Sequence, residues 1–137
     1  MATVEMIEYE KASPEVREVY DDIMATRNID WVNNFWKVLA VQPELLRRTW
    51  NGVKEVMAPG AIDALTKEML YVAVSVGNAC KYCINSHTAA ARKKGMSEAM
   101  LAELMAVVAM ANQTNALANG FQIHLDDAFQ NGGQTPE

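Results

Sequence analysis

Cysteine and histidine are scarce in this chain, whose 137 residues include only two of each. Long apolar runs are missing as well: no stretch reaches the about 18 apolar residues of a membrane-spanning helix. The N-terminus has neither the basic nor the apolar part of a secretory signal. These absences favour a cytoplasmic protein with no membrane partner. In that compartment a Cys-x-x-Cys pair indicates redox or metal chemistry rather than a structural disulfide.

Positive charge is not concentrated in this sequence. The net charge is −5, and the twelve basic residues are scattered along the chain. The densest basic run, Arg92 to Lys94, falls at an expected helix end, where the helix dipole favours cations. We therefore expect no nucleic-acid partner.

The hydrophobic residues, half of the total, provide enough apolar side chains for a core. Their spacing predicts an all-α domain of about six to seven helices over residues 1–130, followed by a disordered tail over residues 131–137. Residues 65–76 are rich in valine, as a strand would be, but no partner strand is evident, so we predict a helix there. The expected helices begin at Pro14, after a Ser13 cap, and then cover residues 33–41, 43–57, 65–76, 79–94 with Gly95 as C-cap, 98–111 after a Ser97 cap, and 115–129.

Three of the four scarce residues, Cys80, Cys83 and His87, lie within eight positions of one another. On a helix they follow one another by about one turn each and share one face. Both thiols fall near the helix start, where the dipole favours thiolate, and His87 is close enough to Cys83 to accept its proton. The spacing thus combines a nucleophilic thiolate, a base and a second thiol.

The same residues allow other interpretations. The cysteines could be a buried packing pair, or Cys80, Cys83 and His87 could bind zinc together with a carboxylate. A disulfide across so short a loop would remove little chain entropy, which disfavours a purely structural bridge. We interpret the pair as a redox-active dithiol. Tyr82 is then a packed or capping aromatic, and His124, the other histidine, a partly buried packing residue beside the apolar face of the last expected helix.

The segment "KEMLYVAVSVGNACKYCINSHTAAARKKGMS" resembles the core of the AhpD-like alkylhydroperoxidases, within the carboxymuconolactone decarboxylase superfamily. The resemblance includes Glu68, twelve residues before Cys80, and extends over residues 45–130. It implies a compact helical domain in which Cys80, Cys83, His87 and Glu68 are catalytic, with Glu68 and His87 as a proton relay. The best-known AhpD proteins have histidine where this chain has Tyr82.

The function that this resemblance implies is a thiol-dependent peroxidase with an antioxidant role, which reduces peroxides through a dithiol–disulfide cycle. An external dithiol of protein or lipoyl type would then reduce the Cys80–Cys83 disulfide, and no cofactor or metal is expected. The helix dipole favours Cys80 as the attacking thiolate, whereas the neighbouring His87 favours Cys83; we expect Cys83 to attack and Cys80 to resolve. The alternatives are a protein dithiol–disulfide oxidoreductase, or a decarboxylase-like lyase, which the cysteine pair disfavours.

Assembly is the last expectation. Residues 31–41 are apolar nearly all round, which is typical of a helix in a core or at an interface. The resemblance implies a trimer or hexamer. We expect a homo-oligomer of this kind, with parts of the N-terminal half and of the helix after Ser97 in the interfaces, and with the cysteines near a subunit boundary.

Overall fold

The computed structural model describes residues 2–130, and every regular element within them is helical. This confirms the predicted all-α fold class, with seven α-helices in the described part of the chain. The predicted tail, residues 131–137, lies outside the described residues. The elements in order are η1 (Tyr9–Lys11), α1 (Pro14–Arg27), α2 (Asn34–Leu39), α3 (Pro43–Met57), α4 (Ala64–Gly77), α5 (Lys81–Lys93), α6 (Glu98–Gly120) and α7 (Asp127–Gln130).

The chain divides into two compact units, Met1–Pro59 and Gly60–Glu137. The first contains η1 and α1 to α3, and the second contains α4 to α7. The single domain expected over residues 1–130 stays a prediction. No helix within residues 2–130 combines the length and the apolarity needed to cross a membrane.

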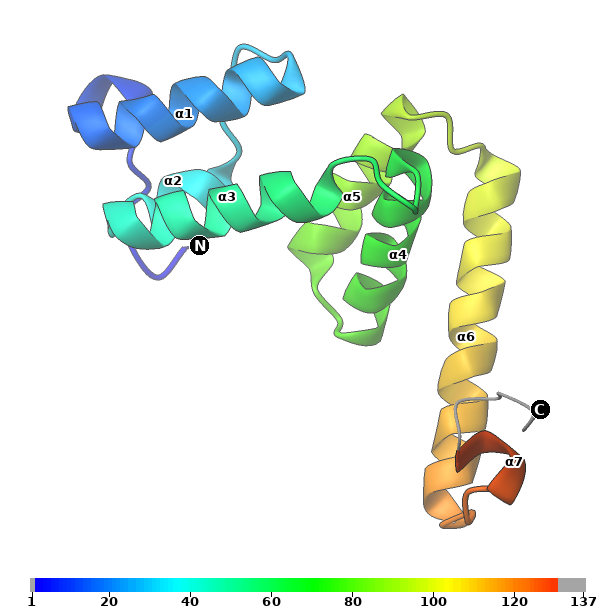
Figure 1. Cartoon of the computed structure of the whole chain (residues 1–137). Helices are drawn as coiled ribbons and strands as arrows, with labels where there is room; N and C mark the ends of the chain where they lie inside the picture. The colour runs from blue at the N-terminus through cyan, green and yellow to red at the C-terminus, as the bar shows by residue number, and fades with distance from the viewer. Residues whose placement is uncertain (1, 131–137) are drawn as a thin grey trace. The chain divides into compact units, whose positions relative to one another are not determined.

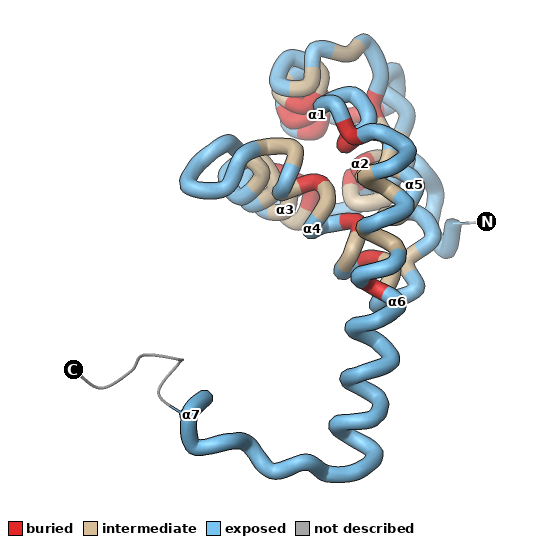
Figure 2. The backbone as a smooth tube through the Cα atoms, turned by 90° about the vertical axis from the view of Figure 1, so that its right-hand side faces the viewer, coloured by how far each residue is buried: buried red, intermediate tan, exposed pale blue. Residues whose placement is uncertain are grey.

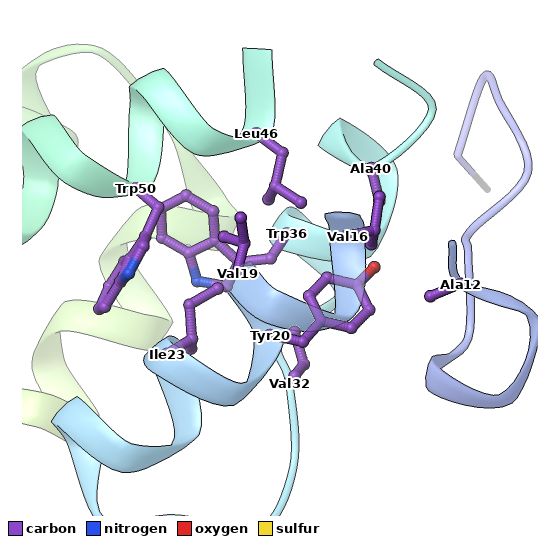
Figure 3. Close-up of a cluster of buried hydrophobic side chains, with 10 residues drawn as sticks. All are labelled: Ala12, Val16, Val19, Tyr20, Ile23, Val32, Trp36, Ala40, Leu46 and Trp50. Carbon is purple, nitrogen blue, oxygen red and sulfur yellow. The ribbon is translucent and has the colours of Figure 1, made fainter. Parts of the chain in front are cut away.

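The core of the first unit lies between α1, α2 and α3 (Figure 3). Ser13 caps α1 as predicted, because its side chain accepts a hydrogen bond from the Val16 N–H at 3.3 Å. The rings of Trp36 and Trp50 meet edge to face, with centroids 5.4 Å apart. Aromatic rings prefer this arrangement because the positive edge of one faces the negative face of the other. Two of the three tryptophans in the sequence therefore stabilise this core.

In the second unit, α4 and α5 lie side by side as a helical hairpin (Figure 1). The valine-rich segment is helical, as predicted, and Asp63 caps α4 by accepting the Thr66 N–H at 2.9 Å. The chain reverses after Gly77, where the sequence predicted a break. Ala79 is the residue that takes the left-handed conformation there, with φ 54°. At the other end of α5, Gly95 has φ 105°, which confirms it as the predicted stop signal.

The C-terminal part of the second unit differs from the prediction. The structure has one 23-residue helix, α6, where helices over residues 98–111 and 115–129 were expected, and after it a loop and the short α7. The polar residues 112–115 include no glycine or proline, so nothing in the backbone interrupts the helix there. Only Val108 of α6 is buried, and most of the helix is exposed (Figure 2).

Candidate active site

The α4–α5 hairpin brings Glu68 and His87 into direct contact. Glu68 lies on α4 and His87 on α5, and Nδ1 of His87 is 2.7 Å from Oε2 of Glu68. An ionised carboxylate can only accept hydrogen bonds, so Nδ1 carries the hydrogen. The other ring nitrogen, Nε2, is then the proton acceptor of the neutral ring. The two residues that the family resemblance pairs as a proton relay are therefore hydrogen-bonded neighbours.

Glu68 is a buried carboxylate with two cationic or donor partners. Nζ of Lys94 lies 3.1 Å from Oε1, so that each carboxylate oxygen has its own partner. Burial disfavours the charged form, but the hydrogen bonds from His87 and Lys94 outweigh it and lower the pKa of Glu68. Glu68 is therefore ionised at neutral pH. Sequence analysis missed Lys94, although it follows His87 by seven residues, about two turns of the same helix face.

Tyr71 is a second residue that sequence analysis missed. Its ring stacks on His87 with centroids 3.6 Å apart and an angle of 18° between the planes. Burial, followed by the negative charges of Cys83, Cys80 and Glu68, raises the pKa of Tyr71, so its phenol stays protonated. The available signal was its position three residues after Glu68, on the same face of α4.

Cys80 is fixed between the two helices of the hairpin. Its backbone N–H donates to the Ser75 oxygen of α4 at 2.9 Å. Its sulfur caps α5 by accepting the backbone N–H of Cys83 at 3.3 Å. Both cysteines are free thiols of intermediate exposure. The structure thus holds the two sulfurs together at the helix start, where the sequence placed them.

The acidity of the two thiols differs in a direction that sequence analysis did not expect. The hydrogen bond from the Cys83 thiol, followed by backbone hydrogen bonds, lowers the pKa of Cys80. Burial, followed by the same thiol–thiol hydrogen bond, raises the pKa of Cys83 to about 11. Of the two thiols, Cys80 is therefore the more readily ionised, whereas the sequence had pointed to Cys83. Which sulfur attacks a substrate stays a prediction.

The two remaining candidates are His124 and Tyr82. His124 belongs to the exposed loop between α6 and α7, so its expected role as a partly buried packing residue on a helix is wrong. Tyr82 is 44% exposed on the first turn of α5. Within residues 2–130, no three His, Cys, Asp or Glu side chains are grouped so that they could hold a metal ion.

The sequence profile of the carboxymuconolactone decarboxylase family matches residues 43–126 of this chain. The chain belongs to that family. A solved member is described as the core of the alkylhydroperoxidase AhpD from Rhodospirillum rubrum, and it superimposes on this chain with a TM-score of 0.91 and 54% sequence identity. The match covers 94% of this chain and 97% of the R. rubrum chain, which confirms the predicted resemblance and fold.

One curated relative is named "Uncharacterized protein 4 in cox locus" and comes from Paracoccus denitrificans. The alignment is 72 residues long with 36% identity, and it covers 47% of this chain and 65% of the relative. The match thus spans slightly less than two thirds of that relative's length, and its name states no activity.

Proposed function

We propose that this chain is a thiol-dependent peroxidase that reduces alkyl hydroperoxides through Cys80 and Cys83. The observation that carries the proposal is an acidic thiol hydrogen-bonded to a second thiol, on the same helix as a histidine that a buried carboxylate orients. The R. rubrum protein, described as an alkylhydroperoxidase core, supports the same reaction. A reducing compartment such as the cytoplasm suits the free thiols.

The oxidising half of the cycle begins at Cys80. Its thiolate attacks one oxygen of the hydroperoxide, the O–O bond breaks, and Cys80 becomes a sulfenic acid. The alkoxide takes a proton from water and leaves as the alcohol. This order reverses the one predicted from the sequence, because the pKa of Cys80 is lowered and that of Cys83 is raised to about 11.

Disulfide formation is the step that needs a base. Cys83 has to lose its proton to attack the Cys80 sulfur, and its raised pKa makes this loss unfavourable without help. His87 is one turn further along α5, on the same face, and its Nε2 can take the proton. The S–O bond then breaks, and hydroxide combines with that proton to leave as water. Glu68 holds the ring in the required tautomer throughout.

An external dithiol completes the cycle. One of its thiols gives its proton to Nε2 of His87 and attacks the Cys80 sulfur as the thiolate. The Cys80–Cys83 bond breaks, and Cys83 takes that proton from His87 and leaves as the thiol. The second thiol of the reductant then releases Cys80 and forms the reductant's own disulfide. Burial, the largest cause of the raised pKa of Cys83, makes Cys80 the sulfur that a protein or lipoyl dithiol reaches first.

The acidic Cys80 also favours a second candidate, a protein dithiol–disulfide oxidoreductase, because low-pKa thiols at helix starts are typical of such enzymes. A lyase of the decarboxylase type is less favoured, since it has no use for the thiol pair.

Turnover assays separate these functions. Consumption of cumene hydroperoxide should require dihydrolipoamide or dithiothreitol and both cysteines, so that Cys80→Ser and Cys83→Ser are inactive. Asn85→Ala, an exposed position on the same helix, is the matched control and should keep activity. Reduction of a protein disulfide such as that of insulin, without peroxide consumption, would favour the oxidoreductase and refute the peroxidase.

We also propose that the chain forms a homo-oligomer, a trimer or a hexamer. On α6, Val107 and Met110 are 66% and 57% exposed, and Leu117 is 49% exposed. The three side chains fall on one face of the helix. Contiguous exposed apolar surface of this kind is typical of an interface.

A further inference from the structure

Lys94 lies at the far end of the candidate site from the thiols, and its ion pair with Glu68 has a chemical consequence. We propose that Lys94 is a positioning residue that keeps His87 in its neutral, proton-accepting form by neutralising Glu68. The inference rests on the proposed function in one respect only, namely that His87 acts as a base for Cys83.

The position of Lys94 is fixed by the way α5 ends. Its backbone N–H donates to the oxygens of Ala90 and Ala91 at 3.2 and 3.0 Å, and the left-handed Gly95 then turns the chain. Met96, which follows, is buried, and its N–H donates to the Ala91 oxygen at 3.0 Å. The backbone of Lys94 is therefore held from both sides, on the same helix face as His87. The side chain reaches the carboxylate from a defined place.

The charges in this cluster determine which form of His87 is favoured. The Glu68 side chain is 9% exposed and the Lys94 side chain 39%. With Lys94 in place, the negative charge of Glu68 is already balanced by one cation. Protonation of His87 would then add a second positive charge to a poorly solvated site. Without Lys94, the whole carboxylate charge would stabilise an imidazolium. The lysine thus favours the neutral ring, in which Nε2 can accept a proton.

The other charged groups of the neighbouring helices do not replace Lys94. On α5, Arg92 pairs with Glu98 of α6 at 2.8 Å, and Lys81 and Lys93 are exposed. On α6, which packs against α4, the remaining acid Glu103 is exposed. The other titratable groups of α4 and its cap are Asp63, Lys67 and Tyr71. Asp63 caps α4 itself, and Lys67 projects about 100° away from Glu68 around the helix axis. The facing thiols are Cys80 and Cys83. Cys83 stays protonated, and a negative charge on Cys80 would favour an imidazolium and so oppose Lys94.

Proton NMR can follow the two histidine rings directly as pH is changed. In Lys94→Met, the His87 ring should change from its charged to its neutral resonance at a pH higher by about one unit than in the parent protein. Lys94→Arg keeps the charge and should restore the parent behaviour. Lys93→Met removes the adjacent, exposed lysine and is the matched control. His124, in the exposed loop after α6, is an internal reference that should not change in any variant.

A second readout follows the chemistry. Loss of a positive charge makes every proton of the cluster harder to remove, so the acid limb of the rate of disulfide formation should move to higher pH by about the same amount in Lys94→Met. Circular dichroism and Lys94→Arg together show whether a variant is folded. If the His87 transition in Lys94→Met coincides with that in Lys93→Met, the inference is overturned. The NMR result needs no peroxide, so it stands or fails separately from the peroxidase proposal.

Discussion

The unequal acidity of the two thiols can be tested by alkylation of the reduced protein with iodoacetamide at pH 8. Only thiolates react appreciably with this reagent. A thiol with a pKa of about 11, as Cys83 has, is about one-thousandth ionised at that pH. At the ordinary value of 9.0 a thiol would be about one-tenth ionised, and Cys80 exceeds this because its pKa is lower.

The expected ratio of rates follows from these fractions. The thiolate population of Cys80 is larger by at least about 100-fold, whereas its lower basicity reduces its intrinsic nucleophilicity by about tenfold over two pKa units. Cys80 should therefore be alkylated at least about tenfold faster than Cys83.

The sequence makes this measurement simple. Trypsin cleaves after Lys67, Lys81 and Arg92, so that Cys80 lies in the peptide 68–81 and Cys83 in the peptide 82–92. Mass spectrometry of samples quenched at intervals gives both rates from one reaction. Cys83→Ala should slow the alkylation of Cys80 because it removes the main hydrogen bond that lowers its pKa, whereas Cys83→Ser keeps a donor and should slow it less. Faster alkylation of Cys83 than of Cys80 in the parent protein would refute this order of thiol acidity.

Three further predictions concern Glu68, Tyr71 and assembly. The pKa of Glu68 is lower in the folded state than the ordinary value of 4.5, so the ionised carboxylate stabilises the fold above pH 4.5, and this contribution disappears as pH falls through the folded-state pKa. In urea unfolding between pH 3 and 6, Glu68→Gln should therefore lose less stability on acidification than the parent protein. An equal loss in both proteins would contradict the pairing. Tyr71→Phe keeps the stack on His87 and should retain peroxidase activity within about twofold. Tyr71→Ala should lose about tenfold in activity because the His87 ring is no longer held in place. Equal effects of the two substitutions would show that the stack has no role. Light scattering of the parent protein at micromolar concentration should give a mass that is a multiple of the 15.2 kDa chain mass. The double variant Val107→Glu/Leu117→Glu should have a smaller mass because it places charges on the apolar face of α6. A parent mass near that of one chain would refute the oligomer.

Sequence analysis predicted most of the fold because local signals decide it. Ser13, Asp63 and Ser97 cap helices through their own side chains, and Gly95 ends α5, so those boundaries depend on residues close together in the chain. The C-terminal helices were predicted wrongly, because residues 98–111 and 115–129 were expected to form two helices although only polar residues separate them. Polarity alone does not interrupt a helix when no glycine or proline is present.

The candidate site was predictable in its residues but not in its electrostatics. The spacing on α5 placed Cys80, Cys83 and His87 together, and the family resemblance added Glu68. Lys94 and Tyr71 were missed because their roles depend on how α4 packs against α5, which no spacing along one helix reveals. The order of thiol acidity was not expected for the same reason: burial, the largest cause that raises the pKa of Cys83, depends on packing and not on spacing along one helix.

The central claim is that Cys80 and Cys83 form one peroxide-reducing dithiol. Its most direct measurement is a thiol titration of the fully reduced protein before and after one equivalent of cumene hydroperoxide, with the products mapped by mass spectrometry. The account predicts the loss of both thiols of the chain as a Cys80–Cys83 disulfide, and in Cys83→Ser a sulfenic acid that can be trapped at Cys80. Thiols that survive the peroxide unchanged would contradict it. A sulfenic acid that forms at Cys83 in Cys80→Ser but not at Cys80 in Cys83→Ser would instead reverse the proposed order of attack.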